Sequence, residues 1–411
     1  MTTENGSSPS IVVVGGGLAG ASAVRELREA GHDGPISLVA AEPHPPYERP
    51  PLSKGILLGT AEAESAQVLE TQWYADHDVS LFTGTAVTGL DPAAGQVLLG
   101  DTHLAYDRLL LATGSVPRRL PELDAHHLPV TYLRILEESV ALRGWLVGAT
   151  DGHLLIVGAG WIGLEIASAA RQAGIRVTVV DPADQPLLKV LGPEVAPYFA
   201  ALHRSHDVDL RLGVTVQEAL ADGAVMLSDG DTVRPDLIAV GIGVAPDDRL
   251  ARAAGLAVED GVLVDASLRT SDPRIFAAGD VANHDHPVLG RRIRVEHWDT
   301  AIHQGRAAAR AMLGQGAPYE RLPYFFTDQY DMGIEYVGSV GPDGYDEVAI
   351  RGDDLVAGLS ALWIKDGVIV AGMHANDWDA IDDLRALVGG PAPEGTTDPE
   401  VTLGDLASRL G

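Results

Sequence analysis

The chain contains no cysteine among its 411 residues. Disulfides, cysteine-ligated zinc, protein-held iron–sulfur clusters and thiol nucleophiles are therefore excluded. Basic residues are also scarce, with 29 lysines and arginines against 58 acidic residues and a net charge of −29. Because nucleic acids and anionic membranes attract basic surfaces, we expect neither as a partner.

Long uninterrupted apolar runs are missing as well. The most apolar long stretch, residues 154–170, contains Glu165 and several glycines, so it does not predict a membrane helix. Residues 1–10 form a polar tail with no base ahead of an apolar stretch and do not resemble a signal peptide. We therefore expect a cytoplasmic protein of two or three domains. His284-Asp285-His286, and the pair His203 and His206, have too few companion ligands to predict a metal site.

A first dinucleotide-binding motif follows the N-terminal tail. Residues 11–14 and 35–40 are predicted strands that flank a predicted helix over 19–30, which is the pattern of a βαβ unit. Between strand and helix stands Gly15-Gly16-Gly17-Leu18-Ala19-Gly20, a match to G-x-G-x-x-G. Its glycines permit a tight turn, close approach of a pyrophosphate and packing of helix on strand. Glu42, after the second strand, is a candidate to bind a ribose hydroxyl.

The same pattern returns in the middle of the chain. Residues 154–157 and 176–180 are predicted strands, and residues 164–173 a predicted helix that follows Gly158-Ala159-Gly160-Trp161-Ile162-Gly163. Asp181 closes the second strand, and an acid there favours a free ribose 2′-hydroxyl and repels a 2′-phosphate. We therefore expect NADH rather than NADPH, although Arg176 and Lys189 could assist a phosphate. Two such sites in one chain suggest electron transfer between a bound flavin and a nicotinamide.

Further segments accompany the two motifs and are jointly specific: Pro46-Tyr47-Glu48-Arg49-Pro50-Pro51-Leu52-Ser53-Lys54, Ala112-Thr113-Gly114, Tyr132-Leu133-Arg134, Val240-Gly241-Ile242-Gly243, Ile275-Phe276-Ala277-Ala278-Gly279-Asp280 and Glu296-His297-Trp298. On these segments, spread over nearly the whole chain, the sequence resembles the putidaredoxin reductase class of FAD-dependent ferredoxin reductases. Members of that class serve ring-hydroxylating dioxygenases and haem monooxygenases.

The resemblance implies an α/β fold of glutathione-reductase type. It would comprise two Rossmann-like domains and a C-terminal α+β interface domain. The expected boundaries are 1–115 with 245–318 for a discontinuous FAD domain, 116–244 for the NAD domain and 319–411 for the interface domain. Short alternating stretches such as 334–340, 347–351 and 359–364, with a helix near 380–387, fit a mainly antiparallel C-terminal domain.

The resemblance also implies which residues bind the cofactors. For FAD these are Gly15, Gly17, Leu18, Ala19, Gly20, Ala41, Glu42, Arg49, Lys54, Val87, Ala112, Thr113, Gly114, Arg134, Gly279, Asp280, Glu296, His297, Trp298 and Phe326. For NAD they are Gly158, Gly160, Trp161, Ile162, Gly163, Glu165, Asp181, Gly241, Ile242 and Gly243.

The pair that the resemblance places at the reacting centre is Lys54 and Glu165. Lys54 would lie beside the flavin and, with Glu165, flank the nicotinamide. A cation near the flavin ring stabilises its reduced, anionic form. The plainer interpretations are a solvated lysine after a proline-rich turn and a helix glutamate paired with a neighbouring base. Trp298 could equally be a core aromatic.

The chain departs from the family pattern at two of these positions. Phe326 stands where the family usually has tryptophan, so stacking survives but an indole donor is lost. Asp181 stands where glutamate is common, which shortens the reach to the ribose.

The function that the resemblance implies is an NADH-dependent flavoprotein that reduces a 2Fe–2S ferredoxin feeding an oxygenase. Two alternatives stay open: an NADH oxidase or pathway-specific reductase acting on oxygen or a small molecule, and a redox sensor similar to apoptosis-inducing factor. We expect a monomer or weak homodimer.

The charge of the C-terminal region does not favour ferredoxin docking there. From Glu320 onward the chain has 18 acidic and five basic residues, whereas an acidic ferredoxin needs a basic surface. A basic cluster is available at Arg291, Arg292, Arg294, Arg306 and Arg310. It is either the docking surface or an ordinary salt-bridged surface.

Overall fold

The computed structural model describes residues 8–124 and 129–410, which divide into two compact units. The first unit holds the described residues up to Arg49, Glu64–Val116 and Val244–Arg321. The second holds Pro50–Ala63, the described part of Pro117–Gly243, and Leu322 onward. Residues 1–7 of the expected N-terminal tail lie outside the described residues. The expected three-domain boundaries stay a prediction, and the structure places Pro50–Ala63 with the second unit.

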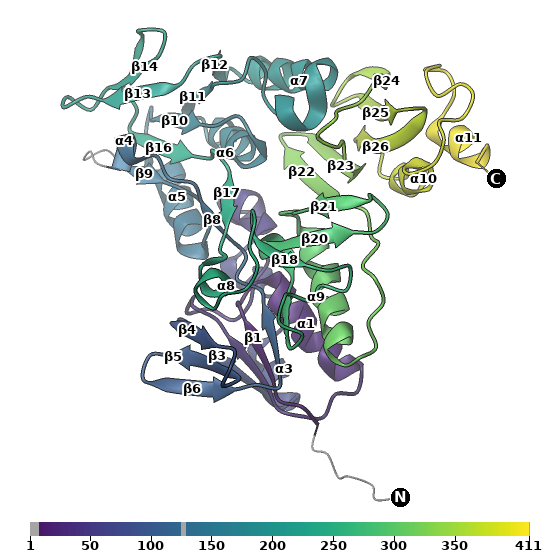
Figure 1. Cartoon of the computed structure of the whole chain (residues 1–411). Coiled ribbons are helices and arrows are strands. Elements are labelled where there is room, and N and C mark those ends of the chain that lie inside the picture. Colours follow the sequence, from purple (N-terminus) through teal and green to yellow (C-terminus); the bar gives the residue numbers. More distant parts are fainter. Residues whose placement is uncertain (1–7, 125–128, 411) are drawn as a thin grey trace, which may run out of the picture. The chain divides into compact units, whose positions relative to one another are not determined.

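The first unit is built on a parallel sheet of five strands (Figure 1). Its order is β19 (Ile275–Ala277), β7 (Arg108–Leu111), β1 (Ile11–Val14), β2 (Ile36–Val39) and β3 (Val79–Phe82). Every residue of β1 is buried, as expected of a strand covered on both faces. Helices α1 (Leu18–Glu29) and α9 (Trp298–Met312) pack on each other beside this sheet. They approach so closely that a Cβ on Gly305 would lie 2.3 Å from the Ala19 carbonyl oxygen.

Smaller elements complete the first unit. They are the sheet of β4 (Gly89–Asp91), β5 (Gln96–Leu99) and β6 (Thr102–Ala105), the sheet of β18 (Val262–Val264), β20 (Ala282–His286) and β21 (Arg291–Ile293), and helices α3 (Thr71–Asp76) and α8 (Arg249–Ala253). A two-stranded sheet pairs β8 (Ser115–Pro117) with β17 (Val244–Pro246).

The second unit contains another parallel sheet of five strands. Its order is β12 (Asp209–Leu212), β11 (Arg176–Asp181), β10 (His153–Val157), β16 (Leu237–Val240) and β9 (Val130–Thr131). Its longer helices are α5 (Leu136–Gly148), α6 (Trp161–Gln172) and α7 (Leu188–Ser205). Short helices α2 (Gly55–Leu58) and α4 (Pro121–Asp124) and the antiparallel sheet of β13 (Val216–Ala219), β14 (Val225–Leu227) and β15 (Thr232–Val233) are appended.

An antiparallel sheet of five strands forms the C-terminal part of the second unit. Its order is β22 (Tyr324–Gln329), β23 (Met332–Gly338), β26 (Val368–Ala375), β25 (Gly358–Lys365) and β24 (Glu347–Asp354). Helices α10 (Ile381–Leu387) and α11 (Leu403–Ser408) share its apolar core. Helix α7 is joined to this sheet where the buried Trp363 indole donates to the Leu191 carbonyl over 3.3 Å.

The strands and helices that flank both glycine motifs were predicted to within a few residues. The alternating C-terminal stretches correspond to β23, β24 and β25, and the helix near 380–387 to α10. Strands β22 and β26 were not predicted. The apolar run of β26 does not distinguish a strand from a buried helix segment, and β22 ends in the polar residues Thr327, Asp328 and Gln329. Helices α5 and α7 were not predicted either.

Candidate cofactor-binding and active site

The outer glycines of the first motif pack so closely against the backbone that neither leaves room for a side chain. Gly15 has a φ of +126°, and a Cβ there would lie 2.0 Å from the Ala112 carbonyl oxygen. A Cβ on Gly20 would lie 2.2 Å from the Gly15 carbonyl oxygen. Ala112, in the quoted Ala112-Thr113-Gly114 segment, is thus the surface against which the turn packs. The neighbouring Thr113 is held by a different segment, since its hydroxyl donates to the Asp247 carbonyl over 2.7 Å.

The second motif repeats this geometry in the second unit. Gly158 has a φ of +108°, and a Cβ there would lie 2.4 Å from the Gly241 carbonyl oxygen. A Cβ on Gly163 would lie 2.0 Å from the Gly158 carbonyl oxygen. Gly241 therefore has the same role beside the second motif that Ala112 has beside the first.

The middle glycine of each motif fits a dinucleotide. An ideal Cβ on Gly17 meets no heavy atom within 4 Å, and one on Gly160 meets only the Gly241 carbonyl oxygen, at 3.9 Å. Gly17 and Gly160 are the N-caps of α1 and α6, and neither helix has a side-chain cap or an acidic residue in its first turn. The positive helix end and its amide donors are thus left to a phosphate, and the open space beside each glycine admits one.

In each unit an acidic residue follows the second strand of the βαβ motif, and the two acidic residues have different hydrogen-bond partners. Glu42 accepts hydrogen bonds from the Tyr47 hydroxyl and, over 2.8 Å, from the Arg49 guanidinium. Asp181 accepts from two backbone amides, Ala159 within the glycine motif at 2.7 Å and Ala183 at 2.8 Å. Glu42 is therefore positioned by side chains, whereas Asp181 also braces its own glycine turn.

The predicted Gly279-Asp280 turn lies in the first unit, in a 3-10 turn over Gly279–Val281. Gly279 has a φ of +76°, and its amide donates to the Gln304 side chain on α9 over 2.9 Å. The Asp280 carboxylate accepts from the Ser115 hydroxyl over 2.7 Å. The turn is thus fixed to the N-terminal half of α9, the helix that also packs on α1.

Lys54 and Glu165 form a buried ion pair in the second unit. The Lys54 ammonium lies 2.5 Å from Glu165 Oε1, and the two side chains are 16% and 3% exposed. The same carboxylate accepts from the Thr327 hydroxyl over 2.6 Å and from the Ser53 hydroxyl. The Lys54 ammonium also lies 5.3 Å from the centre of the Phe326 ring, within the range of a cation–π contact. Lys54 is thus in contact with two other predicted site residues, Glu165 and Phe326.

Other predicted residues are placed as follows. Trp161 packs its ring against Phe199 and Phe325, with ring centres 5.7 and 4.8 Å apart. Ile162 beside it is exposed. Val87 is half-buried against the core of the first unit. The Arg134 backbone amide donates to the Glu138 carboxylate over 2.6 Å, at the start of α5.

Sequence reasoning missed Ser53 and Thr327, the two hydroxyls on Glu165. Ser53 lies next to Lys54 inside the quoted proline-rich segment, and Thr327 next to Phe326, so a search for polar neighbours of the predicted pair could have found both. The predicted assignments of individual residues to FAD and NAD stay a prediction.

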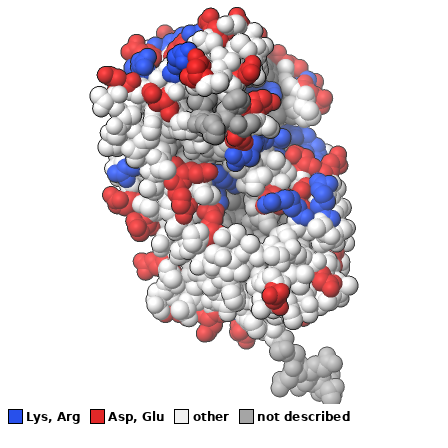
Figure 2. Space-filling view, turned by 90° about the vertical axis from the view of Figure 1, so that its left-hand side faces the viewer, with Lys and Arg blue, Asp and Glu red and all other residues white. Residues whose placement is uncertain are grey.

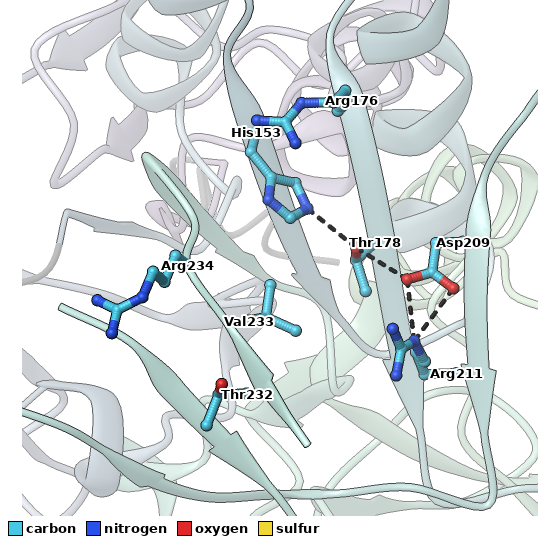
Figure 3. A pocket seen from close by; sticks show the side chains of 8 residues that line it. All are labelled: His153, Arg176, Thr178, Asp209, Arg211, Thr232, Val233 and Arg234. Atoms are coloured by element: carbon cyan, nitrogen blue, oxygen red, sulfur yellow. Dashed lines mark hydrogen bonds and ion pairs between the residues drawn. The ribbon is translucent and has the colours of Figure 1, made fainter.

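A depression of about 390 Å³ lies at the amino ends of strands in the second-unit parallel sheet, away from the carboxyl end at which the second glycine motif follows β10. Figure 3 shows its lining, which is His153, Arg176, Thr178, Asp209, Arg211, Thr232, Val233 and Arg234. His153, Arg176 and Asp209 begin strands β10, β11 and β12, whereas ligands of open α/β sheets bind at the carboxyl ends. Two arginines of this lining are neutralised by carboxylates: Arg211 pairs with Asp209 and Asp231, and Arg234 pairs with Asp222. We therefore do not assign the nicotinamide to this depression.

The predicted basic cluster is partly neutralised. Arg294 pairs with Asp260 and Glu296, and Arg306 and Arg310 both face Glu26. The Arg292 guanidinium donates to the carbonyls of Val264 and Asn283. On the face shown in Figure 2, acidic groups are scattered widely and basic groups gather in a few small clusters.

Two findings concern the other predictions from composition. Within residues 8–124 and 129–410, no group of three or more potential ligands is arranged to hold a metal ion. None of the helices in these ranges is long and apolar enough to span a membrane.

Comparison with known proteins covers almost the entire chain. Residues 9–305 match the pyridine nucleotide-disulphide oxidoreductase family and residues 324–407 the Reductase C-terminal family. The ferredoxin–NAD(+) reductase component of the anthranilate 1,2-dioxygenase system of Burkholderia cepacia is 37% identical, over 97% of this chain and 99% of its own length. Rhodocoxin reductase of Rhodococcus erythropolis is 38% identical, over 96% of this chain and 93% of its own.

A solved structure agrees with these sequence relatives. Putidaredoxin reductase in its covalent complex with putidaredoxin superposes with a TM-score of 0.93 at 34% identity, over 99% of this chain and 100% of the other. The predicted fold class, resemblance, enzyme class and cofactors are confirmed. The chain belongs to the pyridine nucleotide-disulphide oxidoreductase family, as an FAD- and NADH-dependent oxidoreductase of the ferredoxin reductase type.

Proposed function

We propose that this enzyme takes hydride from NADH onto FAD and delivers the electrons singly to a 2Fe–2S ferredoxin that serves an oxygenase. The observation that carries the proposal is the full-length match to a reductase solved together with its ferredoxin, putidaredoxin. The absence of cysteine supports it, since this chain has no thiol through which to reduce a disulfide. We further propose that it works in the cytoplasm, where NADH is regenerated.

The two glycine motifs assign the two dinucleotides. Gly15, Gly17 and Gly20, with Glu42 and Asp280, would hold FAD. Gly158, Gly160 and Gly163, with Asp181, would hold NADH. When bound, FAD supplies a ring that accepts two electrons together and releases them one at a time.

The Lys54–Glu165 pair would act by positioning and by charge. A cation held beside a flavin favours the reduced, anionic ring. Glu165 keeps the Lys54 ammonium in one place, because the carboxylate is buried, the lysine is only 16% exposed and the two groups are 2.5 Å apart. Phe326 offers an aromatic face next to the same ammonium. No side chain here is required to transfer a proton, and correct placement of the reactants would account for the rate.

Ferredoxin docking is proposed at the arginine cluster of the first unit. Arg294 pairs with Asp260 and Glu296, Arg306 and Arg310 both face Glu26, and the Arg292 guanidinium donates to backbone carbonyls. A group of arginines is the kind of surface that an acidic ferredoxin needs. Changing Arg291, Arg292 and Arg294 to glutamate should raise the KM for ferredoxin and leave NADH-driven flavin reduction intact. An unchanged KM would move docking elsewhere.

The test of the function is anaerobic stopped-flow reduction of the FAD-loaded enzyme by NADH, followed by mixing with two-iron ferredoxins or with air-saturated buffer. We expect rapid bleaching of the flavin and reoxidation much faster by a ferredoxin than by oxygen. Fast reoxidation by oxygen alone would establish an oxidase. A persistent charge-transfer band with slow reoxidation would establish a sensor.

A further inference from the structure

We propose that His203, on helix α7, is a positioning residue that holds Glu165 in place through a directed row of hydrogen bonds. The inference rests on the proposed function, in which Glu165 and Lys54 act at the nicotinamide. Among the described residues, His203 shares no hydrogen-bond partner with Glu165 or Lys54, and its pattern in the sequence did not predict a metal site.

The row begins at the carboxylate itself. Glu165 Oε1 accepts from the Lys54 ammonium at 2.5 Å and from the Thr327 hydroxyl at 2.6 Å, while Oε2 accepts from the Ser53 hydroxyl. A carboxylate only accepts hydrogen bonds, so every hydroxyl on it must donate. The single hydroxyl proton of Thr327 is therefore committed to Glu165.

The next bonds follow from this commitment. With its proton used, the Thr327 oxygen must accept, and the Gln329 Nε2 amide donates to it over 3.3 Å. The Gln329 Oε1 oxygen then faces His203 Nε2 at 2.8 Å, so this nitrogen carries the proton. His203 Nδ1 is left as the acceptor for the Tyr330 hydroxyl at 3.3 Å. Every bond in the row thus donates toward the carboxylate.

The surroundings of His203 keep it in the form that this row needs. Its side chain is fully buried. Desolvation lowers the pKa of His203 to about 4, with the Gln329 bond opposing and His206 adding to the shift. The imidazole is therefore neutral near neutral pH, with one donor and one acceptor nitrogen. A protonated, cationic His203 ring would also donate from Nδ1 toward the Tyr330 hydroxyl, so the bonds would no longer all donate toward the Glu165 carboxylate.

The row is fixed at both ends to helices of the second unit. Glu165 and Ser168 lie on the same side of α6, and the Tyr330 amide donates to the Ser168 hydroxyl over 2.8 Å. The His206 ring stacks on Tyr330, with centres 3.6 Å apart and planes 9° apart. The end of β22 is thus held by α6 and α7 together. Bonds in such a chain polarise one another, so its loss costs more than one isolated bond.

The experiment compares His203→Leu, Gln329→Leu and the double variant as FAD-loaded enzymes. We expect each single variant to slow flavin reduction at saturating NADH by roughly tenfold or more, since small misplacement near the reacting groups is costly. The double variant should be no slower than the slower single variant, because both changes break one row. His203→Gln should regain most of the rate, since it restores an amide donor toward Gln329.

A matched control is His284→Leu in the first unit. His284 is also fully buried, its pKa is also lowered to about 4 by desolvation, and neither ring nitrogen has a hydrogen-bond partner among the described residues. This variant should keep the wild-type rate within about twofold. The dissociation constant for NAD⁺ should change little in any of these variants, because the row orients a group rather than adding a contact to the dinucleotide.

A second readout does not depend on activity. Long-range proton–nitrogen NMR of the imidazoles, with the His203 signals identified by their loss in His203→Gln, should show a neutral ring protonated at Nε2 at neutral pH. Gln329→Leu should shift these signals. A ring protonated at Nδ1, or unchanged flavin reduction in both His203→Leu and Gln329→Leu, would overturn the inference while the proposed function stands. A wild-type enzyme whose flavin NADH does not reduce would overturn both.

Discussion

The two glycine motifs of this chain share a frame and differ in what surrounds it. In both, the outer glycines pack against carbonyl oxygens and the middle glycine faces open space. Two residues beyond the last glycine, however, the first motif has Ser22 and the second has the buried Glu165. The frame thus fits a dinucleotide in both places, while only the second motif is followed by a buried charged residue, which the proposed function places at the reacting centre.

The acidic residues that follow the second strand of each βαβ motif also differ in their hydrogen-bond partners. Glu42 is bound by the Tyr47 and Arg49 side chains, whereas Asp181 is bound by backbone amides. The first site is thereby stiffened by a side-chain network, as suits a cofactor that stays. In the second, one aspartate shapes the turn, and under the proposed assignment it would also bind a dinucleotide that must leave after each turnover.

The largest effect should separate the two motifs outright. Gly15→Ala would place a Cβ 2.0 Å from the Ala112 carbonyl oxygen at a φ of +126°, so we expect protein without bound flavin. Gly158→Ala, with a Cβ 2.4 Å from the Gly241 carbonyl oxygen, should keep flavin but lose reduction by NADH. The measurements are the flavin-to-protein ratio and stopped-flow reduction. Normal flavin content in Gly15→Ala would contradict the assignment of FAD to the first motif.

The next effect concerns the charge that only the second motif carries. Glu165→Gln removes the partner of a Lys54 side chain that is 16% exposed, and an unpaired buried charge is costly. We expect flavin reduction to slow by roughly tenfold to a hundredfold at unchanged flavin content. Ser22→Ala, at the equivalent position of the first motif, should leave the rate unchanged. Equal effects of the two changes would remove the distinction between the motifs.

A smaller effect tests the open space beside the middle glycines. Gly17→Ala and Gly160→Ala add a methyl group where the protein offers no clash, so both variants should fold with wild-type thermal stability. The methyl group would instead crowd a phosphate. We expect Gly17→Ala to weaken FAD binding, and Gly160→Ala to raise the KM for NADH, each by roughly tenfold. Altered stability with normal binding would show that these glycines serve the fold and not the ligand.

The smallest effect concerns the choice of nicotinamide. Asp181→Ala removes the negative charge expected to repel a 2′-phosphate, and also the acceptor for the Ala159 amide. The ratio of kcat/KM for NADH to that for NADPH should fall by about tenfold or less. Asp181→Asn, which keeps an acceptor oxygen, separates the loss of charge from the loss of the brace. A ratio unchanged in both variants would mean that Asp181 only braces the turn.

The local sequence pattern was sufficient to predict the two dinucleotide-binding βαβ units. Glycine spacing and β-branched runs identified both βαβ units, since only glycine allows the backbone approaches at Gly15 and Gly158. It was not sufficient for β22, whose residues alternate between buried and half-exposed positions only because β23 pairs with it. The sequence also left the state of the arginine cluster open, because Glu26 lies far away in the chain from Arg310.

The resemblance to the ferredoxin reductases supplied the candidate pair of Lys54 and Glu165. What the sequence determined by itself is the pair of dinucleotide motifs and the exclusion of thiol chemistry. These depend on residue type and short spacing, which are local properties. Only the tertiary structure decided that the Ser53 and Thr327 hydroxyls donate to the Glu165 carboxylate. It also decided that His203 is joined to this carboxylate through Gln329 and Thr327. Hydrogen bonds between side chains so distant in sequence leave no periodic trace, because their partners are chosen by the packing of α6, α7 and β22.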